Sequence, residues 1–189
     1  MTIVVTTEPA EEPLTLAAFK DALRVTSSDF DQELTQLLTA ARRQVEHDSA
    51  RRLVTQTVKL YLDTFPLGDV LQIRTAPVAS VTSVTYIDTA GATQTFAASN
   101  YNADTSSTPS RIILKSGKYW PATEDRTPNA VIVECQAGYG NAAAVPAEAK
   151  LAILEFGKAS WSGCDPETSM VGYNGLIAKL RWTEYHDAT

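Results

Sequence analysis

The N-terminal part of the chain carries apolar residues at helical spacing. In the segment LTLAAFKDALRV, Leu16, Phe19 and Leu23 recur at intervals that place them on one helix face. Thr15 stands where its hydroxyl can accept a free backbone N–H at the helix start. Leu14 and Phe19 hold the positions of a hydrophobic staple. These features predict a short helix over this segment.

A second helical pattern predicts a longer helix, over roughly residues 29–49. Ser27 or Ser28 can cap it, and acidic residues oppose the positive end of the helix dipole in its first turn. One apolar stripe follows: Phe30, Leu34, Leu37, Leu38, Ala41 and Val45. At 1.5 Å per residue this helix would be about 31 Å long, a natural wall element for an assembly.

From Val54 the apolar spacing changes from helical to alternating. The segment VTQTVKLYL alternates apolar and polar side chains, as a half-buried strand does. Further β-type runs, separated by turn signals, occupy residues 70–73, 81–87, 93–96, 111–114 and 130–135. No helical pattern separates them, which favours an antiparallel sheet or small sandwich over a parallel βαβ sheet.

Helical spacing returns after Gly138-Tyr139-Gly140. Pro146 fits the first position of a helix and Glu148 its first turn. The apolar side chains of this helix are Leu151, Leu154, Phe156, Ala159 and Trp161. Gly163 ends it, and after a loop over residues 164–172 a last short helix is predicted over residues 173–185.

The predicted fold class is therefore α+β: N-terminal helices including one long helix, an inserted antiparallel β-sheet or small sandwich, and C-terminal helices. A chain of 189 residues suits one domain, or one domain that carries a large insertion, and can bury about 70% of its unfolded surface. Cys135 and Cys164 have no paired spacing, so free thiols in a reducing compartment are expected.

Charge argues against a nucleic-acid-binding function. Sixteen basic and 22 acidic residues give a net charge of −6. Residues 1–52 carry 6 basic and 9 acidic groups, residues 53–145 carry 6 and 7, and residues 146–189 carry 4 and 6, so no region is net basic. No apolar run is long enough to cross a bilayer, and the N-terminus lacks the features of a signal peptide.

The sequence contains no recognisable catalytic or metal-binding motif. The two histidines, His47 and His186, have no second metal ligand at a suitable spacing, and neither a G-x-S-x-G elbow nor a P-loop occurs. The prediction is therefore a non-enzyme with no catalytic residue, no cofactor and no metal. The segment GYGNAA matches a dinucleotide-binding fingerprint, but the preceding strands look antiparallel, so a plain strand-to-helix turn is favoured.

The aromatic residues allow two interpretations. A carbohydrate-binding module would gather them on one sheet face, whereas aromatics in amphipathic helices are more often core residues or anchors at protein interfaces. The second interpretation is favoured, because Trp161 and Trp182 fall in predicted helices. The residues concerned are Tyr119, Trp120, Tyr139, Trp161, Tyr173 and Trp182.

Several landmarks occur together in one order. They are LTLAAFKDALRV, LLTAARRQVEHDSARRLV, PVASVTSVTYIDTAG, ECQAGYG, VPAEAKLAILEF and the C-terminal helix, and they cover most of residues 14–182. In this order the chain resembles the phage head-to-tail connector (adaptor, or head completion) proteins. Each landmark alone is common, and the specificity lies in their combination.

The resemblance implies a structural protein of the virion neck, made in the host cytoplasm. Such subunits typically form a ring of twelve beneath the portal, joining capsid to tail and continuing the DNA channel. Residues 1–13 would then be an N-terminal arm and residues 14–162 the connector domain, with helices over 14–52 and 146–162 and a β insertion over 53–140. Residues 163–189 would be a C-terminal loop and docking helix.

Partners implied by the resemblance are the portal protein, a tail or stopper protein and further copies of the chain, with no specific nucleic-acid binding and no membrane. The docking role falls on the C-terminal segment: Leu176, Leu180, Trp182 and Tyr185. Candidates for the ring interface are the β section and the long helix with its arginine pairs: Arg42, Arg43, Arg51 and Arg52. Such pairs are also ordinary ion-pair partners, here for Glu46 and Asp48.

Two other functional classes stay open at this point. One is a different virion protein, such as a tail or carbohydrate-binding component. The other is an uncharacterised enzyme whose site the sequence does not reveal.

Overall fold

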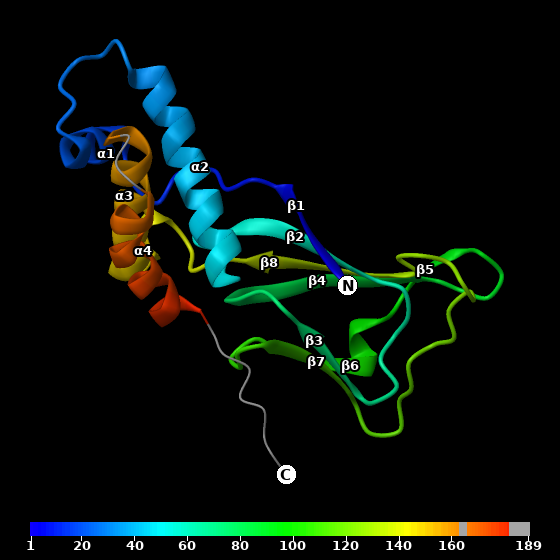
Figure 1. The fold of residues 1–189 in the computed structure, drawn as a ribbon. Helices are drawn as coiled ribbons and strands as arrows, with labels where there is room; N and C mark the ends of the chain where they lie inside the picture. Colours follow the sequence, from blue (N-terminus) through cyan, green and yellow to red (C-terminus); the bar gives the residue numbers. More distant parts are fainter. Residues whose placement is uncertain (163–165, 182–189) are drawn as a thin grey trace. The chain divides into compact units, whose positions relative to one another are not determined.

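A computed structural model describes residues 1–162 and 166–181, with the side chains of residues 166–169 excepted. The predicted α+β fold is confirmed (Figure 1). The chain divides into two compact units, described separately below. The sheet unit comprises Met1–Ala10 and Thr55–Gly138, and the helical unit comprises Glu11–Val54 and the chain from Tyr139 onward.

The sheet unit contains two antiparallel sheets. Its strands are β1 (Thr2–Thr7), β2 (Gln56–Leu62), β3 (Val70–Ile73), β4 (Val78–Ile87), β5 (Thr93–Thr95), β6 (Tyr101–Asp104), β7 (Ser110–Leu114) and β8 (Val131–Ala137), with a 3₁₀ turn η1 (Ala98–Asn100). Five strands pair in the order β1-β2-β8-β4-β5 and three in the order β3-β7-β6 (Figure 1). Side chains from both sheets enclose one core, which is the arrangement of a small sandwich.

Alternation along the central strands explains this core. In β2, Val58 and Leu60 are fully buried, and they lie opposite Cys135 and Val133 of β8. The residues between them are half-buried, and there Lys59 forms an ion pair with Glu134 at 3.1 Å. The period of two seen in the sequence is therefore the in-and-out pattern of a strand with one face on the core.

Two strands were not predicted. Residues 2–7, expected to belong to an N-terminal arm, form β1 and pair with β2 in antiparallel register. Ile3 and Val5 pack against the core of the sheet unit while Val4 is exposed, so the alternation in TIVVTT is the signal that could have identified this strand. The second, β6, is only four residues long and pairs with β7.

The helical unit begins as the sequence predicted. Helix α1 (Leu16–Leu23) has Thr15 as its N-cap, whose side chain accepts a hydrogen bond from the N–H of Ala18 at 3.2 Å. Helix α2 (Asp31–Ser49) differs in one detail, because its N-cap is Phe30 and no side chain caps it. The prediction of Ser27 or Ser28 as the cap was wrong.

Small residues make the close helix contacts in this unit. Helix α3 (Ala147–Ser162) buries Ala149, Ala152, Ile153 and Gly157, whereas Leu151, one of the apolar side chains of the predicted helix, is 44% exposed. A Cβ atom on Gly157 would lie 2.5 Å from two ring atoms of Phe19 on α1, so the glycine admits the phenyl ring. Four residues of the predicted stripe on α2 are buried, Leu34, Leu38, Ala41 and Val45, whereas Phe30 precedes the helix and is 44% exposed.

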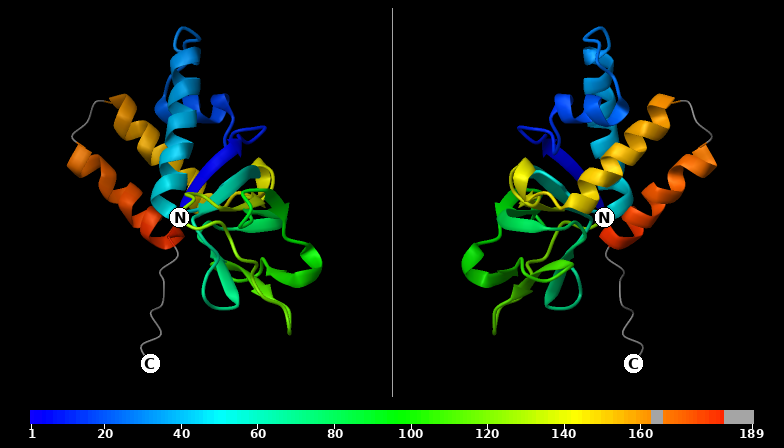
Figure 2. Two further views of the ribbon diagram at one scale, coloured as in Figure 1. Left: turned by 90° about the vertical axis from the view of Figure 1, so that its right-hand side faces the viewer. Right: turned by 90° about the vertical axis from the view of Figure 1, so that its left-hand side faces the viewer.

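The last helix belongs to the core of the helical unit. Helix α4 (Pro166–Leu180) begins ahead of the predicted start at residue 173 and lies beside α3 (Figure 2). Its residues Tyr173, Ile177 and Leu180 are 1%, 8% and 7% exposed and join the helical core. The expectation that this helix stands apart from the core was therefore wrong, because its apolar stripe is already covered within the chain.

Candidate assembly surfaces

Arg42, predicted as a ring-interface residue, is buried within the helical unit. Its side chain is 2% exposed and donates to Glu12 at 2.8 Å and to Glu46 at 3.1 Å. Thr39 also donates to Glu12, at 2.9 Å. The expected pairing of this arginine with Glu46 is confirmed. Its role at a ring interface stays a prediction, and two carboxylates neutralise the side chain inside the unit, which leaves little of it exposed to a neighbouring subunit.

Arg51 and Arg52 also bond within the helical unit. Arg52 lies 3.7 Å from the carboxylate of Glu46, and that carboxylate accepts the N–H of Leu53 at 2.9 Å. Arg51 donates to the carbonyl oxygen of Leu180 and, at 3.1 Å, to the hydroxyl of Tyr139. The first of these bonds ties the end of α4 to the segment after α2. Both arginines therefore stabilise the unit from partly exposed positions.

Arg43 is the one exposed member of the four arginines. It lies on the outward face of α2, opposite the buried stripe, in a shallow hollow along the helix. The residues lining this hollow are Thr35, Gln36, Thr39, Ala40, Arg43, Gln44 and His47. Of these four arginines Arg43 thus has the most exposed side chain, and its role at a ring interface stays a prediction.

The predicted docking residues fall into two groups. Leu180 is buried and Leu176 is half-buried, both against the helical core. Trp182 and Tyr185 lie outside the described residues. Docking on a portal stays a prediction for all four, and the burial of Leu180 leaves little of that side chain for a partner.

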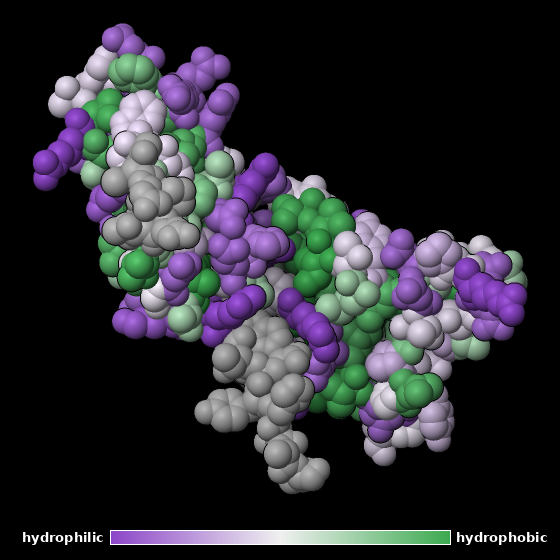
Figure 3. Space-filling view, viewed as in Figure 1, coloured by the Kyte–Doolittle hydropathy of each residue, from purple (hydrophilic) through white to green (hydrophobic). Residues whose placement is uncertain are grey.

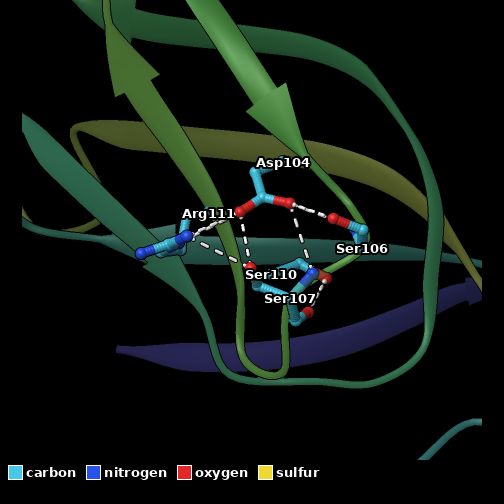
Figure 4. A network of polar contacts seen from close by, with 5 residues as sticks. All are labelled: Asp104, Ser106, Ser107, Ser110 and Arg111. Carbon is cyan, nitrogen blue, oxygen red and sulfur yellow. Dashed lines mark hydrogen bonds and ion pairs between the residues drawn. The ribbon is translucent and has the colours of Figure 1, made fainter.

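A network of polar contacts lies at the β6–β7 turn of the sheet unit (Figure 4). The Asp104 carboxylate accepts hydroxyl hydrogen bonds from Ser106 at 2.7 Å and Ser107 at 2.6 Å, and a guanidinium hydrogen bond from Arg111 at 2.7 Å. These hydrogen bonds hold the pKa of Asp104 well below its usual 3.8, and the bond from the Ser107 hydroxyl has the largest effect. Ser110 donates to the Ser107 carbonyl at 3.2 Å. The Asp104 carboxylate is therefore hydrogen-bonded to residues of the β6–β7 turn and of β7, and the cluster stabilises this turn.

Two exposed apolar side chains stand on loops of the sheet unit. Leu67 is fully exposed and Tyr119 is 82% exposed. Their loops are joined because the Trp120 indole donates to the Gly68 carbonyl at 2.8 Å and stacks on Phe65 at a centroid distance of 4.8 Å. An aromatic cluster therefore holds these loops in place while their tips face solvent. Figure 3 shows apolar side chains on the exposed surface of this unit.

Several of the described aromatic residues pack against other aromatic rings inside one of the two units. Trp120 packs among Phe65 and Phe96 in the sheet unit. Trp161 contacts Phe30 edge-on at 5.5 Å in the helical unit, where Tyr173 packs on Phe156. For Trp120, Trp161 and Tyr173 these contacts agree with the favoured interpretation of core and anchor residues, whereas Tyr119 is 82% exposed. Trp182 lies outside the described residues.

The glycine-rich segment forms a strand-to-helix turn. Gly138 and Gly140 have φ angles of 136° and 123°, and the Asn141 side chain accepts from the N–H of Ala144 at 3.2 Å in the 3₁₀ turn η2 (Ala142–Ala144). The preceding strand β8 lies between two antiparallel neighbours, whereas a dinucleotide site needs a parallel sheet.

Within residues 1–162 and 166–181, no three histidine, cysteine, aspartate or glutamate side chains are grouped to hold a metal ion. None of the described helices has the length and apolar character that crossing a lipid bilayer requires.

Comparison with solved structures finds chains of the same fold over almost the whole length. A chain from the neck of an empty gene transfer agent (GTA) particle, computed with C6 symmetry, is 26% identical with a TM-score of 0.77, covering 97% of this chain and 96% of that one. A chain from the virion of a native GTA particle is 24% identical, with a TM-score of 0.78 and the same coverage. A chain from the neck of a native GTA particle, computed with C12 symmetry, is 24% identical, with a TM-score of 0.74 and the same coverage.

The sequence comparisons find no such likeness. No protein-family model matches the chain. No curated protein sequence matches it either.

Proposed function

We propose that this chain is a structural protein of the neck of a phage-like virion, and within the neck a head-to-tail connector (adaptor) subunit. The observation that carries the proposal is the likeness to a GTA neck chain at 26% identity and a TM-score of 0.77 over 97% of this chain. A likeness over both units at once means that the sheet unit and the helical unit occur together in a neck protein. Catalysis has no part in the proposed role.

Ring formation follows as part of the proposal. Copies of a subunit around a cyclic axis contact one another through two different patches, and closure fixes their number. The GTA necks were computed with C6 and C12 symmetry, which supports a ring of identical subunits here, with twelve as the expected number. Arg43 and the outward face of α2 are candidates for one patch, and the sheet unit is a candidate for the other.

The charge of the chain suits a channel through which DNA moves. With a net charge of −6, the protein lacks the excess of lysine and arginine that binds phosphates tightly. The proposed partners are the portal protein on one side and a tail or stopper protein on the other. The C-terminal segment, with Leu176, Leu180, Trp182 and Tyr185, is the proposed portal contact.

Deletion of the gene in the producing strain tests this function. The expected result is DNA-filled heads and free tails that fail to join, with tailed particles restored by the gene supplied in trans. A tagged copy should localise to the neck in electron micrographs of the particles. Normal tailed particles without the protein, or a label at the tail tip, would overturn the proposal.

A further inference from the structure

The five-stranded sheet ends in two strands that have a pairing partner on one side only among the described residues. Strand β1 pairs with β2, and β5 pairs with β4 (Figure 1). An unpaired strand edge presents backbone N–H and C=O groups that another extended chain can satisfy. Soluble proteins commonly protect such edges with lysines, prolines or inward-pointing charges.

Strand β1 lacks a charged side chain along its length. Its six residues are TIVVTT, all of them threonine or branched aliphatic residues with high strand propensity. Val4 at its centre is 42% exposed. Apart from a register irregularity between Val5 and Thr7, nothing within this strand discourages a further strand from pairing with its outer edge.

Strand β5 offers a second uncharged edge. All three of its residues, Thr93, Gln94 and Thr95, are exposed. The N–H of Phe96 donates to the Val84 carbonyl, and the carbonyl of Ala92 accepts from the N–H of Asp88. The backbone N–H and C=O groups of the even-numbered residues of this segment therefore point toward β4. Because backbone groups alternate in an antiparallel ladder, the N–H and C=O groups of Thr93 and Thr95 point outward.

We propose that β5 of one subunit pairs with β1 of the adjacent subunit in the ring, which joins the sheets of neighbouring copies. The proposal rests on the function proposed above. A second copy of this chain is the partner that pairs with each edge. A cyclic ring needs two different contact patches on each subunit, and the edges of β1 and β5 are two such patches on one sheet. Closure of the ring also leaves none of these edges unpaired, as in a closed barrel.

The direction and length of the strands define this joint. Four antiparallel steps separate β1 from β5, so the two strands run the same way and form a parallel pair when one copy follows another. A parallel pair is less stable per residue than an antiparallel one, and β5 has only three residues. The joint alone is therefore weak, and rings form when a second surface holds the subunits together.

Cysteine cross-linking in assembled particles tests the pairing directly. In a Cys164→Ser background, with the natural Cys135 fully buried, the variant Val4→Cys is combined with Thr93→Cys, Gln94→Cys or Thr95→Cys in turn. The expected result after mild oxidation is a ladder of dimers, trimers and larger species for at least one combination. The matched control replaces Val4→Cys by Ile132→Cys, which lies on the central strand β8 and should give no ladder.

A Val4→Cys single variant that gives dimers and nothing larger indicates β1–β1 pairing across a two-fold axis and overturns the proposal. Protein located in the neck with no ladder in any combination also overturns it, while the proposed function stands. Protein absent from the neck contradicts the proposed function itself, and the inference falls with it.

A proline tests the hydrogen bonds of the joint. Thr95→Pro removes an outward N–H and leaves the inward bonds of β5 in place, as proline is tolerated on edge strands. Thr95→Val is the control, because it also loses the hydroxyl but keeps the N–H. With equal thermal stability, the proline variant should lower the association constant at each joint about fivefold (about 1 kcal/mol) relative to the valine variant. Equal ring assembly by the two variants would contradict the proposal that the outer edge of β5 pairs with a neighbouring subunit.

Discussion

Tyr173 on α4 donates its hydroxyl hydrogen to a carboxylate oxygen of Asp48 on α2 over 2.6 Å. The Asp48 carboxylate also accepts from the Gln44 amide at 3.0 Å. Burial by itself raises the pKa of Asp48, but hydrogen bonds from Tyr173, Gln44 and His47 outweigh it and hold this pKa below its usual 3.8. Burial, followed by the bond to Asp48, raises the pKa of Tyr173 above its usual 10.0. The pair therefore couples α4 to α2.

The variant Tyr173→Phe should lower the free energy of unfolding by about 1.5–3 kcal/mol at neutral pH, the usual contribution of a hydrogen bond to a charged group. The effect should depend on pH in the alkaline range. Because the pKa of Tyr173 is raised in the folded state, its stabilising contribution is complete below pH 10.0 and declines as pH rises above it. Denaturant unfolding between pH 8 and about 11 should show the wild type approaching the variant.

The acid side provides a separate check on the same pair. A lowered pKa of Asp48 gives stability that is present above pH 3.8 and is lost as pH falls below it. The wild type should therefore lose more stability than Tyr173→Phe on acidification. A difference between the two proteins that stays constant from acid to alkaline pH would show that the bond contributes nothing through ionisation.

Gly157→Ala should destabilise the helical unit by about 1–3 kcal/mol. An added Cβ would meet the Phe19 ring at 2.5 Å, a distance that the packed ring can relieve only by moving. The control is Gly175→Ala on α4, where an added Cβ meets nothing within 4 Å. That change should stabilise the protein by about 0.5–1 kcal/mol, as alanine normally does in a helix. Thermal unfolding of both variants measures the contrast.

A second substitution identifies the cause. Phe19→Leu shortens the opposing side chain, so Gly157→Ala should be less destabilising in that background than in the wild type. The coupling free energy from the double-mutant cycle should therefore be favourable. Additive effects would mean that the glycine is needed for some reason other than the ring of Phe19.

Element type was predictable from the sequence where the apolar pattern was long and regular. The stripe of α2 and the alternation of β2 and β8 each extend over several periods, and the structure buries most of the residues that these patterns select, with Phe30 an exposed exception. Strand β1 is not predicted because TIVVTT is a single short run, which the resemblance assigns to an N-terminal arm. The sequence pattern also does not identify the buried face of α3, because alanine and glycine occupy much of this face while larger side chains such as Leu151 are exposed.

Candidate interface residues were harder to predict because charge in a sequence does not reveal burial. Arg42 and Arg43 are neighbours in one helix, yet the first is 2% exposed and the second lies on the surface. Helical geometry turns successive residues by about 100°, so two adjacent arginines cannot share one environment. The arginine bonded to Glu12 depends on a partner 30 residues away, which no local pattern indicates.

This contrast yields a third prediction. Arg42→Met should lower the free energy of unfolding by about 3–5 kcal/mol, because it leaves the carboxylates of Glu46 and Glu12 without their central cation. Arg43→Met should change stability much less and should instead reduce ring assembly, if the outward face of α2 contacts a neighbour. Chemical denaturation measures the first effect and sedimentation of portal-bound complexes the second. Equal destabilisation by the two changes would contradict the assigned positions.

The last prediction separates folding from docking at the C-terminus. Truncation after Ser162 removes α4 and with it the buried side chains of Tyr173, Ile177 and Leu180. It should therefore destabilise the helical unit strongly, since the loss of each large buried side chain alone costs about 2–5 kcal/mol. Truncation after Arg181 retains α4 and the bond from Arg51 to the Leu180 carbonyl. This shorter deletion should leave thermal stability nearly unchanged.

Portal association then tests Trp182 and Tyr185 without loss of the fold. If these residues anchor the subunit, truncation after Arg181 should abolish co-purification with the portal, and Trp182→Ala should weaken it by about 2 kcal/mol or more, as expected for an interface hot spot. Tyr185→Ala gives an independent comparison. Because Leu180 is already covered by the helical core, its substitution should act mainly through stability. Full portal binding by the chain truncated after Arg181 would place the contact elsewhere, on a surface that the described residues already present.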